Sequence, residues 1–157
     1  MSQVNLACIH RINLSPGGVP KTPVADATVS VLGIDGDQQR YLRYHGGPKR
    51  AVCLFALELI KRLQQEGHPI FPGSTGENIT TAGLDWNLLS PGTKLKLGDD
   101  VTLEITSYTA PCKNISGSFA GEDFKRISQK LHPGESRLYA RVLNEGRIKT
   151  GDIITVL

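Results

Sequence analysis

The sequence predicts a β-rich barrel decorated by two or three short helices. Three observations carry this prediction. First, 17 glycines and 9 prolines divide the 157 residues into many short segments. Second, apolar residues alternate on both sides of Gly98-Asp99-Asp100, which is the pattern of a β-hairpin. Third, only two segments place their apolar residues at helical spacing. Short strands separated by turns are typical of a barrel or a sandwich. These observations therefore predict the β-rich fold class but not its strand topology.

The first part of the chain predicts two strands that flank a loop. Residues 15–20 hold two prolines and two glycines in six positions, which favours an irregular connection. Short apolar runs of strand length flank this loop at residues 3–9 and 27–34.

The second half predicts two further pairs of strands. Residues 93–97 and 101–107 form the hairpin, because every second side chain is apolar in each of them. Residues 138–143 and 153–157 resemble a second pair, and Gly151-Asp152 precedes its last strand.

Two segments predict helices. Residues 56–66 place their apolar side chains on one face, and Gly67 stands where a C-terminal cap is expected. Residues 119–131 repeat Phe124, Ile127 and Leu131 at helical spacing, and Pro133 follows.

Length and charge limit the classes of protein. A chain of 157 residues fits one domain, residues 1–157. The net charge of +3 comes without a basic run that alternates with aromatic residues, so we expect no nucleic-acid partner. No apolar run approaches the roughly 18 residues that span a bilayer, and the start does not resemble a signal peptide. We therefore expect a cytoplasmic protein with no membrane partner.

Two glycine-containing clusters predict an anion site. Gly17-Gly18-Val19-Pro20-Lys21 combines a loop whose backbone can approach an anion with the charge of Lys21. His45-Gly46-Gly47-Pro48-Lys49-Arg50 combines a histidine, two glycines and two cations before an apolar strand. The simpler interpretation of both clusters is a turn with solvated cations.

Two further clusters carry reactive groups. Gly76-Glu77-Asn78 offers a carboxyl group and an amide, although an Asx-type turn explains it equally. Cys112 lies in a turn between Pro111 and Lys113, and the lysine charge favours a thiolate. Cys8 and Cys53 lie in apolar runs, which is typical of small core residues. One thiolate supplies too few ligands for a structural zinc site but suits a soft metal or sulfur transfer.

In combination these clusters resemble the MOSC family, named for the carboxy-terminal domain of molybdenum cofactor sulfurases. The matching pieces, in order, are Gly17-Gly18-Val19-Pro20-Lys21, Gly33-Ile34-Asp35-Gly36-Asp37, His45-Gly46-Gly47, Gly76-Glu77-Asn78, Leu97-Gly98-Asp99, Pro111-Cys112 and Gly151-Asp152. Each piece is weak alone, whereas their order and spacing are specific. The length is most similar to the small stand-alone bacterial, YiiM-like type.

The resemblance implies a MOSC-type β-barrel that binds the molybdenum cofactor (molybdopterin). Cys112 would ligate molybdenum or carry sulfur, and His45 and Glu77 would be catalytic proton donors. The cofactor would be held by the residues Lys21, Gly46, Gly47, Lys49, Arg50, Asn78, Lys113 and Arg141. Relatives include reductases of N-hydroxylated bases and amidoximes, which act on small molecules and draw electrons from flavin or haem proteins. No segment resembles a pyridoxal-phosphate site.

One departure concerns a cation. Many members have an arginine shortly before Pro-Cys, where this chain reads Ser107-Tyr108-Thr109-Ala110. If that arginine holds an anion, Lys113 or Arg141 must replace it here. Three functions stay open: a molybdenum-dependent oxidoreductase for N-hydroxylated compounds, a non-catalytic sulfur carrier or cofactor delivery protein, and a barrel for another anion. Whether the chain forms a homodimer is also open.

Overall fold

The structure, a computed structural model, describes residues 6–37 and 47–157. Within them the chain forms eleven strands, one α-helix and several 3-10 helical turns. The strands are β1 (Cys8–Leu14), β2 (Thr22–Val24), β3 (Asp26–Ser30), β4 (Gly33–Ile34), β5 (Val52–Ala56), β6 (Ile79–Ala82), β7 (Lys94–Leu97), β8 (Val101–Tyr108), β9 (Leu138–Asn144), β10 (Gly146–Lys149) and β11 (Ile154–Val156). The helix is α1 (Leu57–Gln65), and the 3-10 turns are Pro48–Arg50, Trp86–Leu88, Lys113–Ser118, Ala120–Glu122 and Phe124–Ile127.

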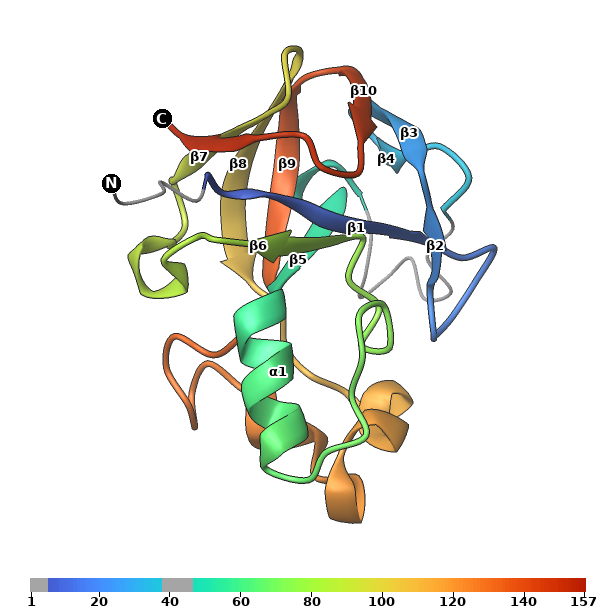
Figure 1. Cartoon of the computed structure of the whole chain (residues 1–157), viewed down its shortest axis with the longest axis vertical. Helices are drawn as coiled ribbons and strands as arrows, with labels where there is room; N and C mark the ends of the chain where they lie inside the picture. Colours follow the sequence, from blue (N-terminus) through green and yellow to red (C-terminus); the bar gives the residue numbers. More distant parts are fainter. Residues whose placement is uncertain (1–5, 38–46) are drawn as a thin grey trace, which may run out of the picture.

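The described strands form two sheets, with the orders β11-β7-β8-β9-β5-β6-β1-β2 and β10-β3-β4. The larger sheet curls until β1 meets the segment that leads into β11 (Figure 1). There the amide of Ile9 donates to the carbonyl of Asp152 at 2.8 Å, and the amide of Gly151 donates to the carbonyl of Ile9 at 2.8 Å. The prediction of a mainly β fold is confirmed. Within the described residues, the sheets approach a barrel without completing its ladder.

The helix α1 connects β5 to β6, which run parallel in the larger sheet. Parallel neighbours cannot be joined by a tight turn, so the chain needs a crossover. The predicted helix at 56–66 is confirmed, because α1 buries Leu59, Ile60 and Leu63. After it, Gly67 takes a φ of 99°, and its amide donates to the carbonyl of Gln64 at 3.0 Å.

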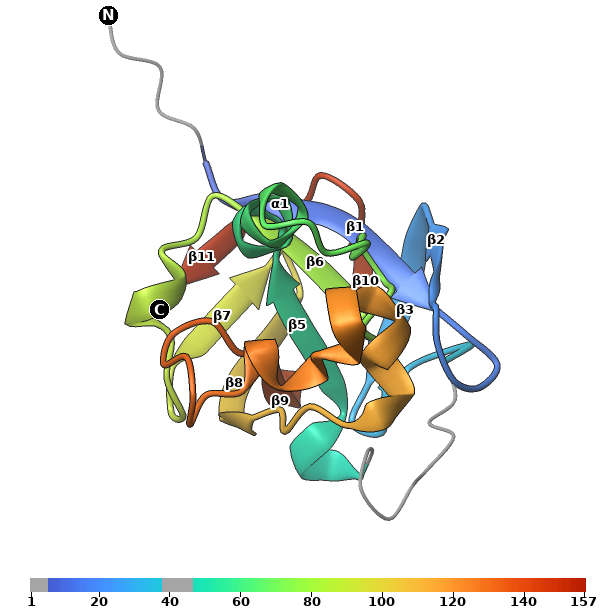
Figure 2. The ribbon, with the colours of Figure 1, turned by 90° about the horizontal axis from the view of Figure 1, so that it is seen from below.

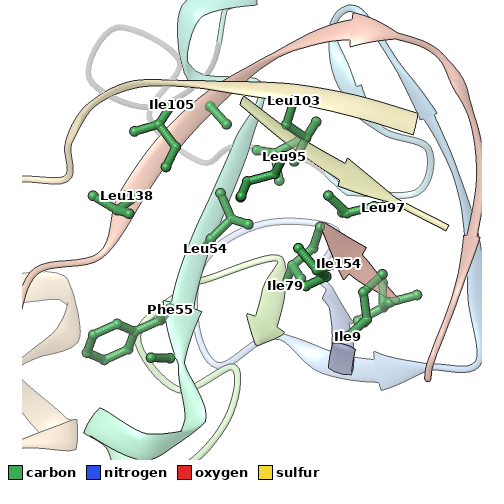
Figure 3. Packing of buried hydrophobic residues seen from close by; sticks show 14 of the residues in the cluster. Ile9, Leu54, Phe55, Ile79, Leu95, Leu97, Leu103, Ile105, Leu138 and Ile154 are labelled. Atoms are coloured by element: carbon green, nitrogen blue, oxygen red, sulfur yellow. The ribbon is translucent and has the colours of Figure 1, made fainter. Parts of the chain in front are cut away.

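The predicted hairpin supplies much of the core. Leu95 lies opposite Leu103 in the β7–β8 ladder, and both side chains are buried. Figure 3 shows them packed with Leu54 of β5 and other apolar residues of the curled sheet. Alternation works here because one face of each strand meets the interior while the other faces solvent.

Two expected strands differ from the structure. β1 begins at Cys8 and continues to Leu14, whereas the apolar run ended at residue 9. Asn13 interrupts the apolar pattern but is fully buried, because it donates to Thr80 Oγ1 at 3.0 Å. The expected pair of 138–143 with 153–157 is wrong. β9 lies between β8 and β5, whereas β11 pairs with β7.

The segment 119–131 forms short 3-10 turns instead of the expected helix. Gly121 and Glu122 take positive φ values of 63° and 58°, which interrupt the segment before Phe124, and Ser128 ends the next turn with extended backbone. The apolar spacing still marks buried residues such as Ile127, although Leu131 is exposed. Figures 1 and 2 place these turns across the same end of the sheet as α1.

None of the helices in the described part of the chain is long and apolar enough to span a membrane.

The core predicts a clear difference between two leucines. Leu103→Ala should lower the free energy of unfolding by about 2–5 kcal/mol, because it removes buried methyl groups and leaves a cavity. Leu88 is 73% exposed, so Leu88→Ala is the matched control and should change stability by less than about 0.5 kcal/mol. Urea unfolding measures both, and equal effects would contradict the assigned core.

Candidate functional site

Cys112 lies just beyond the end of β8, where the chain leaves the sheet. Thr109 extends the β8–β9 ladder by one step, since its amide donates to the carbonyl of Arg137 at 2.9 Å. Three residues later, the carbonyl of Cys112 accepts from the amide of Ile115 at 3.1 Å and opens the turn Lys113–Ser118. The cysteine is free and partly exposed. The expected position of Cys112 in a turn after the hairpin is thus confirmed.

A second cysteine lies deeper, beside the same strand end. Cys53 of β5 is buried, and its Sγ lies 3.7 Å from Thr109 Oγ1. Burial raises the pKa of the Cys53 thiol, so it stays protonated at neutral pH. The interpretation of Cys53 as an interior residue is confirmed, whereas Cys8 on β1 is partly exposed.

Tyr139 connects the two cysteines. It faces Cys53 in the β5–β9 register, and Arg50 lies over its ring at 5.6 Å from the centroid. Burial raises the pKa of the Tyr139 hydroxyl, and the thiols of Cys53 and Cys112 act in the same direction. Tyr139 therefore keeps its proton at neutral pH beside Cys112. Sequence reasoning missed it, since a tyrosine in a strand is an ordinary residue.

Lys21 takes part in a buried network. Its Nζ lies 2.7 Å from Asp37 Oδ2, and both side chains are about 5% exposed or less. The same oxygen accepts from Asn78 Nδ2 at 2.9 Å, while Oδ1 accepts from the amide of Ser15 at 3.0 Å. Asn78 continues the network, since its Oδ1 accepts from the amide of Cys53 at 3.0 Å.

Glu77 is enclosed in the loop before β6. The carboxylate accepts from the amide of Gly73 at 3.0 Å, from Thr75 Oγ1 at 2.9 Å and from Thr80 Oγ1 at 3.2 Å. Burial raises the pKa of Glu77, and the hydrogen bonds from Gly73 and Thr75 oppose the shift. The geometry gives Glu77 a part in ordering the loop. Its predicted role as a proton donor stays a prediction.

The loop is fitted closely to Lys21. The amide of Lys21 donates to the carbonyl of Gly73 at 2.9 Å. Gly73 has a φ of +87°, and a Cβ there would lie 2.4 Å from the carbonyl oxygen of Lys21. Only glycine allows this approach.

The other predicted cations lie at the surface. Gly47 leads into the turn Pro48–Arg50, on which Lys49 and Arg50 are exposed, and Lys113 is exposed beside Cys112. Arg141 is exposed farther along β9, where it pairs with Glu104 of β8. The predicted His45 and Gly46 lie outside the described residues.

Arg137 is the cation that the sequence analysis missed. It directly precedes β9, and its residue is 4% exposed. Its Nη1 donates to the carbonyl of Thr75 at 2.5 Å, whereas its Nε and Nη2 are buried and have no hydrogen-bond partner among residues 6–37 and 47–157. Its charge lowers the pKa of Cys53, Glu77 and Tyr139, against the larger effect of burial. A charged residue next to an apolar strand was the available signal.

A metal held by side chains alone is not supported in the described part of the chain. Residues 6–37 and 47–157 contain no group of three or more His, Cys, Asp or Glu side chains placed to hold an ion. A separate hollow of about 330 Å³ lies between α1 and residues 133–135, and its lining includes none of the predicted site residues.

The ion pair predicts a large effect of losing one partner. Asp37→Ala should lower the free energy of unfolding by about 3–5 kcal/mol, because the Lys21 ammonium stays buried without a countercharge. In Lys21→Met/Asp37→Ala the loss should be smaller than in Asp37→Ala alone. Asp26 pairs with Arg147 at the surface, so Asp26→Ala is the control and should cost at most about 1 kcal/mol. If urea unfolding shows a loss in the double variant that equals or exceeds the loss in Asp37→Ala, the buried pair is contradicted.

Glu77 predicts a pH dependence. Burial raises its pKa in the folded state above the ordinary value, so between the unfolded and folded pKa values the folded state holds the additional proton. The free energy of unfolding should therefore fall as pH rises through that window. Relative to Glu77→Gln, wild type should be most stable at the acidic end. Thermal melting of both proteins across this range measures the difference, and a pH-independent difference would contradict the raised pKa.

Comparisons with known proteins identify a family and several relatives of this chain. A family model described as the MOSC domain matches residues 42–155. The uncharacterized protein YflK of Bacillus subtilis is 28% identical over 142 residues, which are 89% of this chain and 63% of YflK. A protein of Gibberella moniliformis named "Reductase" is 30% identical over 132 residues, which are 82% of this chain but only 23% of that protein.

Solved structures give the same fold. The crystal structure of YiiM from Geobacillus stearothermophilus superposes with a TM-score of 0.73 and 24% identity, covering 96% of this chain and 75% of that one. At this identity the likeness shows the fold alone. The family model, which spans most of the chain, shows more: the chain belongs to the MOSC domain family.

Proposed function

We propose that this chain binds the molybdenum cofactor with Cys112 as a metal ligand and reduces N-hydroxylated bases or related compounds. The observation that carries the proposal is the place of Cys112, a free and partly exposed thiol just beyond the end of β8. It follows Thr109 by three residues, and the amide of Thr109 donates to the carbonyl of the buried Arg137. Membership of the MOSC family and a relative named a reductase support the same direction.

The donor set fits such a cofactor. A single cysteine suits a soft metal that brings its other ligands with it. Arg137 offers two buried donors that have no partner in the described residues. Arg50 lies over the ring of Tyr139, and the exposed Lys113 follows Cys112 directly. An anionic cofactor would meet charge-assisted hydrogen bonds there.

Each residue near the thiol has a distinct task in the proposal. The cofactor, when bound, supplies two-electron redox chemistry at molybdenum. Cys112 Sγ anchors the metal, while the exposed Lys49 and Arg50 bind negative charge. Tyr139 keeps its hydroxyl proton beside Cys112 and orients the bound cofactor or substrate through a hydrogen bond.

The overall reaction fixes what else must reach the site. Reduction of an N–OH group to N–H consumes two electrons and two protons and releases water. We propose that the protein works in the cytoplasm and that a flavin or haem protein supplies the electrons. Glu77, whose pKa is raised by burial, and His45 stay the proposed proton donors.

The decisive variants change one cysteine at a time. Cys112→Ser should lose molybdenum, whereas wild type purified from cells that make the cofactor should retain a stoichiometric amount. Cys8 is also free and partly exposed, so Cys8→Ser is the matched control, and Cys53→Ser tests the buried thiol. Both should retain the metal in elemental analysis.

Two results would contradict metal ligation by Cys112. One is equal molybdenum in wild type and Cys112→Ser. The other is loss of the metal in all three folded variants. If the loaded wild type fails to reduce an N-hydroxylated base with a chemical electron donor, and mass spectrometry finds a persulfide on Cys112, the sulfur-carrier function replaces the reductase.

A further inference from the structure

Arg137 carries an unexplained charge inside the protein. Its residue is 4% exposed, and Nε and Nη2 have no hydrogen-bond partner in the part of the chain that the structure describes. Buried donors without partners cost free energy, and a guanidinium does not lose its proton in proteins. A buried guanidinium with unpaired donors indicates that a partner binds there, and an ion is one of the usual partners.

The two unpaired nitrogens lie on the same edge of the guanidinium. Nη1 is on the other side and donates to the carbonyl of Thr75. The edge made by Nε and Nη2 presents two parallel N–H groups, the geometry that binds two oxygens of one oxyanion. The position of Arg137 is fixed by its backbone, since its carbonyl accepts from the amide of Thr109 at 2.9 Å and from Ser136 Oγ at 2.7 Å.

The charges around Arg137 favour an anion. The nearby Lys21 is neutralised by Asp37 at 2.7 Å, so that pair contributes little net charge. Glu77 forms no ion pair with Arg137, and its carboxylate is held instead by the amide of Gly73 and the hydroxyls of Thr75 and Thr80. The guanidinium charge is therefore left without a direct countercharge in the described residues.

We propose that Arg137 binds a tetrahedral oxyanion, a phosphate or a phosphate monoester, through Nε and Nη2. The inference does not require metal at Cys112. It also gives this chain the anion-binding cation that it lacks before Pro111, because Arg137 bonds across the strand ends to Thr109. Both nitrogens are enclosed, so the neighbouring loops must part to admit the anion, and association should be slower than diffusion allows.

Inorganic phosphate is the probe, used on protein from cells that cannot make the molybdenum cofactor. Phosphate should bind wild type in titration calorimetry and raise its melting temperature. Arg137→Lys keeps a charge without the two-pronged edge and should weaken binding by about tenfold or more. Arg137→Gln should abolish binding. Arg141 is exposed and already paired with Glu104, so Arg141→Gln is the matched control and should bind phosphate as wild type does.

A crystal structure of wild type grown with phosphate provides a second measurement if Arg137→Gln fails to fold. Density for an oxyanion on Nε and Nη2 supports the proposal. An ordered water there, no phosphate binding by wild type, or undiminished binding by Arg137→Lys and Arg137→Gln would overturn it.

Two further arms separate the sources of the anion and the two proposals. If the phosphate of a bound cofactor occupies the site, protein loaded with that cofactor should bind no added phosphate, whereas a site for free phosphate stays open. Cys112→Ser should bind phosphate as wild type does. If Cys112→Ser loses molybdenum but still binds phosphate, the result supports metal ligation by Cys112 and leaves the anion site unaffected. If Arg137→Gln loses phosphate binding but retains molybdenum, the result supports the anion site and leaves metal ligation unaffected.

Discussion

A buried ion pair between Lys21 and Asp37 holds together the segments that surround the site. It joins the loop before β2 to the end of residues 33–37, and Asn78 attaches both to β6. Because the pair is buried, removal of either partner would destabilise the fold, since the remaining charge would have neither solvent nor a countercharge. The glycine motif at residues 33–37 therefore has a structural role, since it ends at Asp37, the carboxylate that pairs with Lys21.

From that pair a continuous series of contacts leads to Cys112. Asn78 accepts from the amide of Cys53, and the thiol of Cys53 lies 3.7 Å from Thr109 Oγ1. Three residues later comes Cys112, held at the start of a short 3-10 turn. The motifs that contain Lys21, Asp37 and Asn78 are thus parts of one scaffold that positions the segment leading to the thiol of Cys112.

The interior beside this scaffold combines the fixed positive charge of Arg137 with two acids, Glu77 and Cys53, whose pKa values are raised by burial. Thr75 touches both kinds of group, since its carbonyl accepts from Arg137 and its hydroxyl donates to Glu77. Neither Glu77 nor Cys53 accepts a hydrogen bond from the guanidinium, whose one partner in the described residues is the carbonyl of Thr75. The two unpaired donors suit an anionic ligand better than a cation.

Local patterns predicted the elements whose structure depends on local sequence. The hairpin around Gly98 and the helix α1 follow from alternation and helical spacing, and the ordered motifs predicted the family. The partners of β9 and β11 could not be predicted, because pairing depends on how the whole sheet curls. Residues 119–131 misled the periodicity, since positive φ values at Gly121 and Glu122 break the helix.

The site was predicted unevenly for a similar reason. Cys112, Lys21 and Glu77 belong to recognisable motifs, although the structure gives Lys21 and Glu77 buried partners that spacing does not reveal. Arg137, Asp37 and Tyr139 matter through contacts between distant segments. No single stretch of sequence shows that Arg137 is buried or that two of its nitrogens lack partners.

X-ray absorption at the molybdenum edge tests ligation by Cys112 most directly. If Cys112 ligates the metal, the loaded wild type shows one protein sulfur bound to molybdenum in addition to the sulfurs of the cofactor, and that contribution persists in Cys8→Ser. A wild-type spectrum with only cofactor sulfur and oxygen around molybdenum would contradict the central claim, whatever the metal content of the protein.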